Sequence, residues 1–195
     1  MTDRVRSTFL EAQHEAAVAL AASSGILDLT PLEGRPPDRY IADFRCRGLV
    51  RDGDTVLLAE RFIIGIRIPD DYLRTFRPEQ VLTVLAPLNI WLPNIRGPLL
   101  CPGHMAPGTP LVDLLFQIHE VLAGQRLTLD EKWALNPLAC AWARDNRHMF
   151  PVDPRPLVRR HVGGDAGWTG PPPAAGTRAP ASARRQSSRQ GSVRP

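Results

Sequence analysis

The sequence predicts an α+β fold, on three observations taken in chain order. A helical pattern opens the chain, runs of alternating polar and apolar residues follow, and two further helical patterns come late. At 195 residues, with 43% hydrophobic and 23% charged residues, the chain is long enough for one globular domain. We expect that domain over residues 1–162 and a disordered tail over residues 163–195, where Pro, Gly, Ala, Ser and Arg predominate.

The distribution of charged and apolar residues excludes several functional classes. Five arginines and one aspartate in residues 163–195 account for the formal net charge of +4, so residues 1–162 are neutral. A neutral domain does not favour nucleic-acid binding. No stretch approaches the ~18 consecutive apolar residues of a membrane span, and the N-terminus lacks the pattern of a secretory signal. We therefore expect a cytoplasmic protein with neither a nucleic-acid nor a membrane partner.

An amphipathic helix is the first element that we expect. Residues 8–11, Thr-Phe-Leu-Glu, fit a capping box, and residues 23–25, Ser-Ser-Gly, end the helical pattern. A connector rich in proline and glycine follows over residues 31–37. The apolar positions of the helix are Phe9, Ala12, Ala16, Ala17 and Leu20.

Three β-strands are predicted next. Residues 39–47 alternate with apolar side chains on one side, which is typical of a half-buried antiparallel strand. Residues 51–54 supply a turn, and residues 55–68 predict a second, longer strand. Residues 80–86 predict a short third strand that ends at Pro87. Short polar turns between successive strands indicate an antiparallel meander.

Two helices are predicted in the second half of the chain. Thr109 as the N-cap and Pro110 at the first helical position predict a helix that Gly124 ends. An Asn-Pro pair opens a second helical pattern over residues 136–149, before another proline.

The segment over residues 91–101 carries the candidate site. Its two prolines and one glycine exclude a helix or a central strand, so we expect an irregular loop that exposes its last residue, Cys101. Cys46 and Cys140 occupy apolar positions of a strand and a helix, as small core residues do. His104 has no orienting partner in the pattern, which argues against a Cys–His catalytic pair. Three distant cysteines predict neither disulfides nor a zinc site, and motifs for organic cofactors are absent.

The motifs around this loop resemble those of the ubiquitin-conjugating enzyme family. Its members carry an Ile-Pro-x-x-Tyr-Pro turn, a β-run, a His-Pro-Asn tripeptide, an active-site cysteine soon after that Asn, and two later helices that open on Ser-Pro and Leu-x-x-x-Ala patterns. The corresponding residues here are Ile68-Pro69-Asp70-Asp71-Tyr72, Leu92-Pro93-Asn94, Gly97, Cys101, Thr109-Pro110 and Leu135-Asn136-Pro137-Leu138-Ala139. The resemblance covers residues 5–152 and implies the family's fold, with an N-terminal helix, an antiparallel β-meander, an active-site loop and C-terminal helices.

The resemblance also implies a function. A transferase of this type accepts the C-terminal carboxyl of a ubiquitin-like protein as a thioester, here on Cys101, and passes it to an amine on a target. Asn94 would donate an amide N–H to the developing oxyanion or order the loop. Asp130 and Glu131 would assist the incoming amine; the alternatives are simple solvated loop charges or acids at a helix N-terminus. The implied partners are the modifier protein, its activating enzyme, and a ligase or deubiquitinase-like protein, with no cofactor.

Four departures from the family pattern leave a second hypothesis open. Leu92 replaces the family histidine, Leu73 replaces a proline, Pro102 follows the cysteine directly, and a Pro-Arg-Pro segment over residues 154–156 stands where further helices are common. Such changes resemble divergent bacterial members. The alternative is a catalytically inactive module that binds a ubiquitin-like protein or its activating enzyme. A cysteine hydrolase or a redox protein would need an oriented base or a resolving cysteine, and neither is visible in the sequence.

Overall fold

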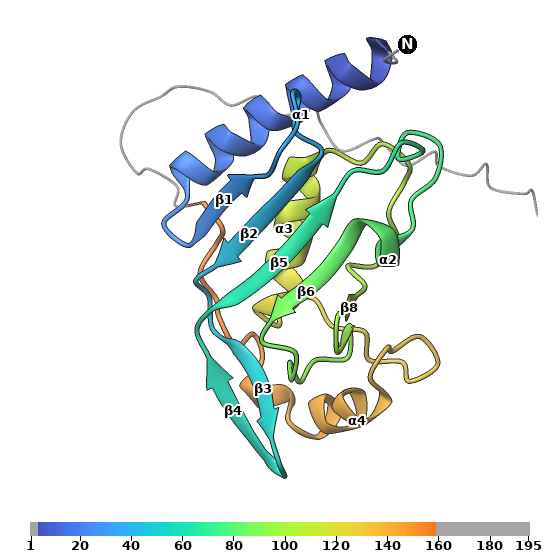
Figure 1. Cartoon of the computed structure of the whole chain (residues 1–195). Helices are drawn as coiled ribbons and strands as arrows, with labels where there is room; N and C mark the ends of the chain where they lie inside the picture. Colours follow the sequence, from blue (N-terminus) through green and yellow to red (C-terminus); the bar gives the residue numbers. More distant parts are fainter. Residues whose placement is uncertain (1–3, 159–195) are drawn as a thin grey trace, which may run out of the picture. The chain divides into compact units, whose positions relative to one another are not determined.

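The computed structural model describes residues 4–158 (Figure 1). Its helices and strands succeed one another as helix, strands and late helices, which confirms the α+β class. The predicted tail and the predicted domain boundary at residue 162 lie outside the described residues. In chain order the elements are α1 (Arg4–Ser23), β1 (Leu27–Pro31), β2 (Arg39–Phe44), β3 (Gly48–Asp52), β4 (Thr55–Ala59), β5 (Phe62–Arg67), α2 (Pro78–Val81), β6 (Leu82–Ala86), β7 (Ile95–Arg96), β8 (Leu99–Leu100), α3 (Leu111–Leu122), α4 (Pro137–Asp145) and a 3₁₀ turn (Arg147–Met149).

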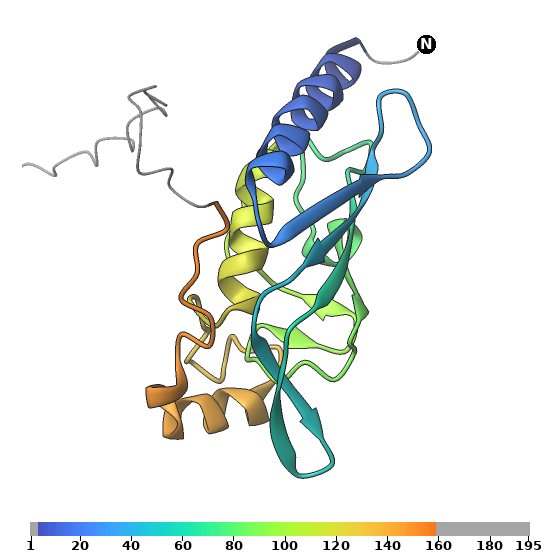
Figure 2. The ribbon, with the colours of Figure 1, turned by 90° about the vertical axis from the view of Figure 1, so that its left-hand side faces the viewer.

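The main sheet has the strand order β1, β2, β5, β6, and each neighbouring pair is antiparallel. Alternate residues of its two central strands are buried on the inner face, namely Tyr40, Ala42 and Phe44 of β2 and Ile64 and Ile66 of β5. Figure 2 shows α3 along this face of the sheet, with α1 beside it. The hydrophobic core therefore lies between the sheet and these two helices.

The N-terminal helix, α1, begins before the predicted start, so the capping-box prediction at Thr8 is wrong. Nη2 of Arg6 donates to the backbone carbonyl of Ile68 at 2.9 Å, and this contact with a distant segment helps to hold the first turn. Local sequence carries no sign of that contact. The buried residues of α1 are Leu10, Ala17 and Leu20, whereas Ala12 and Ala16 are exposed.

The long strand predicted over residues 55–68 is wrong, because it is divided into β4 and β5. β4 pairs with β3, which was not predicted, in a hairpin that projects from the main sheet (Figure 1). Gly48 permits the close approach at the base of this hairpin, since a Cβ there would lie 2.6 Å from the ring of Phe62. The edge strand β1 was also missed, and only Leu27 of its five residues is buried, so its hydrophobic pattern is weak.

The α3 helix occupies its predicted position without its predicted cap. The hydroxyl of Thr109 donates to the carbonyl of Ala106 at 2.6 Å and makes no capping bond. The first helical N–H, that of Leu111, instead donates to Oε1 of Gln13 on α1 at 2.8 Å. A side chain of another helix therefore does what the local threonine was expected to do. Gly124 ends the helix with φ of +67°, as predicted.

The α4 helix begins as predicted and ends earlier. Oδ1 of Asn136 accepts from the N–H of Ala139 at 3.1 Å, which is an N-cap bond. The helix stops at Asp145, and a 3₁₀ turn occupies the rest of the predicted span.

None of the helices within residues 4–158 has the length and apolar character that would let it cross a membrane.

Residues 150–158 form an extended segment that ties the end of α3 to the first strand. The carbonyl of Ala123 accepts from the N–H groups of Val152 at 2.9 Å and Asp153 at 3.1 Å. The hydroxyl of Ser24, just before β1, donates to the carbonyl of Leu157 at 2.6 Å. These bonds hold the segment across the α3 side of the molecule.

Candidate functional site

The segment over residues 91–101 is less irregular than predicted, because it contains a small hairpin. β7 and β8 pair antiparallel, with Ile95 opposite Leu100 and Arg96 opposite Leu99. Gly97 lies at the turn with φ of +56°, a conformation that glycine adopts without strain. The hairpin ends immediately before Cys101, so the backbone that leads to the thiol is fixed by strand pairing.

Asn94 holds both sides of this hairpin. Its backbone carbonyl accepts from the N–H of Cys101 at 2.9 Å, and its Nδ2 donates to the carbonyl of Cys101 at 3.1 Å. Nδ2 also donates to Oγ1 of Thr128 at 3.0 Å, while Oδ1 accepts from the N–H of Thr128 at 2.9 Å. The asparagine is 3% exposed, and both of its amide hydrogens are engaged. The N–H and the carbonyl of Cys101 are thus both bound by one residue, through the backbone carbonyl of Asn94 and through its side-chain amide.

The predicted site residues Asn94 and Cys101 are therefore in direct contact. Because no amide hydrogen of Asn94 is free, the described arrangement corresponds to the ordering role considered for this residue. Donation to an oxyanion would require one of the present bonds to break. Cys101 itself is partly exposed, whereas the other two cysteines are buried.

Leu92, the residue that the resemblance sets against a histidine, is fully buried in the core. The carbonyl of Leu92 accepts from the N–H of Ile95 at 3.2 Å, which closes the turn before the hairpin. An apolar side chain at this position therefore anchors the loop through packing. Pro102, the residue after the thiol, is buried as well.

The loop that carries Asp130 and Glu131 is attached at both ends to the segment that precedes Cys101. Thr128 is bound to Asn94 at one end, and the N–H of Asn136 donates to the carbonyl of Pro93 at 3.0 Å at the other. The structure thus brings residues 129–135 to the side of the candidate site, as Figure 1 shows for the chain between α3 and α4.

Neither acid in this loop is held in a fixed orientation by a buried partner among the described residues. Oδ1 of Asp130 accepts from the N–H of Lys132 at 3.0 Å, and Glu131 forms an ion pair with Arg144. Both acids are exposed. Trp133, in the same loop, is 70% exposed, which is unusual for so large an apolar side chain.

Cys46 and Cys140 are buried, which confirms their predicted place in the core. Burial, together with the nearby carboxylate of Asp153, raises the pKa of Cys46 to about 12. Burial also raises the pKa of Cys140, whose Sγ donates to the carbonyl of Thr128 at 3.4 Å. Because the thiolate is the nucleophilic form, neither residue suits covalent chemistry.

His104 is exposed in the loop after Cys101 and makes no hydrogen bond or ion pair with the residues that the structure describes. A general base needs a partner that fixes its ring, and none is present in this part of the chain. Within residues 4–158, no cluster of three or more His, Cys, Asp or Glu side chains could hold a metal ion.

Thr128 is the residue of this site that sequence reasoning missed. It lies 34 positions from Asn94, and neither its neighbours nor its spacing indicates a loop-clamping role. Comparisons of the sequence with models of known protein families and with curated proteins find no match. The site consists of a partly exposed cysteine at the end of a paired hairpin, beside a second loop that is hydrogen-bonded to it.

Proposed function

We propose that this chain is a conjugating transferase for a ubiquitin-like protein, with Cys101 as its acceptor. The thiolate of Cys101 attacks the thioester carbonyl that joins the modifier to an activating enzyme, and the thiolate of that enzyme leaves. A target amine then attacks the new thioester, the thiolate of Cys101 leaves, and the amine gives up a proton as the amide forms. One cysteine is sufficient for both steps.

The observation that carries this proposal is the clamp of Asn94 on Cys101. A thiol that receives a carbonyl from one protein and presents it to another must keep one orientation while both partners approach. The two bonds between Asn94 and Cys101, at 2.9 and 3.1 Å, fix the backbone on each side of the thiol. Support also comes from the resemblance of the motif order, and from an α+β architecture in which the loop follows the antiparallel strands.

Asn94 acts in this proposal as a positioning residue. Its amide hydrogens are bound to Cys101 and Thr128, so its contribution is the shape of the loop. Asp130 and Glu131 lie in the attached loop, where an exposed carboxylate can attract a cationic lysine and take its proton. The competing hypothesis is that both acids are only solvated loop charges. Asp130→Asn and Glu131→Gln separate the two, because only a role in catalysis predicts slower transfer to the amine.

The test is formation of a covalent adduct. The full chain is incubated with ATP and with a panel of ubiquitin-like modifiers, each with its own activating enzyme. We expect a thiol-sensitive adduct with one member of the panel, loss of that adduct in Cys101→Ala, and a thiol-resistant oxyester in Cys101→Ser. The matched control is Cys140→Ala, which removes a buried thiol and should leave the adduct unchanged.

An adduct that persists in Cys101→Ala would overturn the proposal. Modifier binding without any adduct would instead favour the alternative, an inactive module that binds a ubiquitin-like protein or its activating enzyme. One observation favours this alternative. Both amide hydrogens of Asn94 are already bound, so this side chain has no free N–H for an oxyanion.

A further inference from the structure

A surface depression of about 570 Å³ is lined by residues none of which belongs to the segment over residues 91–101. It is formed by the connection that follows β2, the connection that precedes β5 and the C-terminal segment. Four arginines and one glutamate line it, namely Arg45, Arg47, Glu60, Arg61 and Arg155. The proposed thioester chemistry uses none of these side chains.

The carboxylates that pair with two of these arginines lie beneath them. Arg155 pairs with Asp153, and the side chains are 46% and 0% exposed respectively. Arg61 pairs with Asp43, and the side chains are 66% and 16% exposed. Solvent therefore meets guanidinium groups, while the compensating acids are covered. A third arginine, Arg45, pairs with an aspartate that is as exposed as itself.

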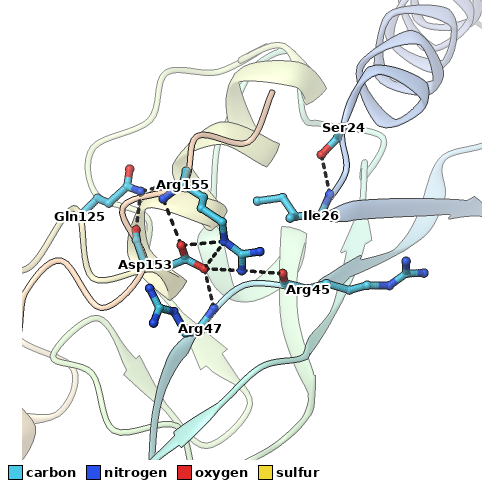
Figure 3. Close-up of polar contacts among 7 residues, drawn as sticks. All are labelled: Ser24, Ile26, Arg45, Arg47, Gln125, Asp153 and Arg155. Atoms are coloured by element: carbon cyan, nitrogen blue, oxygen red, sulfur yellow. Dashed lines mark hydrogen bonds and ion pairs between the residues drawn. The ribbon is translucent and has the colours of Figure 1, made fainter. Parts of the chain in front are cut away.

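These ion pairs also fix the guanidinium groups in place. Figure 3 shows Arg155 held between Asp153 and the backbone carbonyl of Arg45. Nε and Nη2 of Arg155 donate to the carboxylate at 3.0 and 2.6 Å, and Nε and Nη2 of Arg61 donate to Asp43 at 3.1 and 2.8 Å. Nη1 of each remains without a partner among the described residues. Fixed side chains with free N–H groups lose little conformational entropy when an anion binds.

Arg47 is the fourth cation, and it differs from the other three. Its backbone N–H donates to Asp153 at 2.8 Å, which anchors the residue, while its guanidinium has no hydrogen bond or ion pair within residues 4–158. The side chain is exposed. Its full charge is therefore available to a ligand, and its removal should not disturb the fold.

We propose that this arginine-lined depression binds a polyvalent oxyanion of the phosphate class, such as a pyrophosphate group. The planar guanidinium donates paired N–H groups that match phosphate oxygens. Three of the four guanidiniums are already paired with aspartates that do not line the depression, so the charge left for an anion is that of Arg47. Glu60 repels an anion and limits its affinity. The competing explanation is an ion-pair network that only stabilises the fold, and it predicts no ligand.

Isothermal titration of the full chain with sodium pyrophosphate tests the proposal. We expect saturable binding to one site, weakened about tenfold in Arg47→Gln, which corresponds to about 1.4 kcal/mol. Glu60→Gln should bind several-fold more tightly, because it removes the repelling charge. The matched control is Arg67→Gln at the opposite end of β5, an exposed arginine without a partner among the described residues, and it should bind as the wild type does.

Two results would overturn the proposal. One is the absence of saturable binding. The other is an equal loss in Arg47→Gln and Arg67→Gln, which would mean that pyrophosphate responds only to the overall positive charge of the chain. Cys101→Ala should leave the titration unchanged, so failure of the transferase proposal and failure of this one are told apart.

Discussion

Replacement of Asn94 by alanine separates the ordering of the loop from direct chemistry. The substitution removes the three side-chain hydrogen bonds, two to Thr128 and one to Cys101, at distances from 2.9 to 3.1 Å. A net contribution of about 1 kcal/mol for each bond gives a loss of about 3 kcal/mol in the free energy of unfolding. The asparagine is 3% exposed, so water cannot readily replace the lost partners. For a domain of roughly 150 residues this loss lowers Tm by about 6–12 °C.

Thermal unfolding followed by circular dichroism measures the stability change, and alkylation of Cys101 by iodoacetamide measures the loop. We expect faster alkylation in Asn94→Ala, because the backbone around the thiol is released. The matched control is Asn89→Ala, which removes one exposed bond, from Nδ2 to the carbonyl of Arg51 at 2.9 Å, and should cost less than about 1 kcal/mol. An unchanged Tm and alkylation rate in Asn94→Ala, together with lost transfer, would refute the ordering role and favour an oxyanion donor.

Three further predictions concern the tertiary contacts around the site. Asp153→Asn should lower the free energy of unfolding, measured by urea titration, by about 2–4 kcal/mol. The wholly buried carboxylate accepts from the partly exposed guanidinium of Arg155 and from two backbone N–H groups. Burial alone would raise the pKa of Asp153, but those hydrogen bonds outweigh burial and hold the pKa below its ordinary value. The carboxylate therefore stabilises the fold above the unfolded-state pKa of about 4, and urea titrations at lower pH should show this contribution fall in the wild type and not in Asp153→Asn. Gly124→Ala should lower the free energy of unfolding more than Gly53→Ala does in the same assay. Both glycines have positive φ, but a Cβ at Gly124 would lie 2.6 Å from a ring carbon of Phe150, whereas one at Gly53 meets nothing within 4 Å. Equal losses of stability would show that backbone strain alone decides the effect.

Several features of the fold could be read from the sequence because they depend on local chemistry. The α+β class follows from hydrophobic period, since alternation over residues 39–47 and helical spacing after Pro110 require no partner to be recognised. Gly124 as a helix end and the helix start at Asn136-Pro137 were correct for the same reason. The burial of Cys46 and Cys140 followed from the elements on which they lie.

The errors arose where a distant residue decides the outcome. The cap of α3 is Gln13, which lies 98 positions from the N–H that it binds, so Thr109 was a reasonable and wrong choice. The division of the long strand into β4 and β5 coincides with a close approach of Phe62 to Gly48, and no periodicity indicates such a contact. The first turn of α1 is held in the same way, by the contact between Arg6 and Ile68.

The candidate site likewise combines features set by local sequence with features set by distant contacts. The sequence by itself determined that Cys101 ends a segment rich in proline and glycine and that Asn94 precedes it, because those residues restrict the backbone wherever they occur. Only the tertiary structure decided that Asn94 clamps the thiol segment with its side chain and that Thr128 completes the clamp. A side-chain amide can bind any group that folding brings within about 3 Å, and that choice is set by packing across the whole chain.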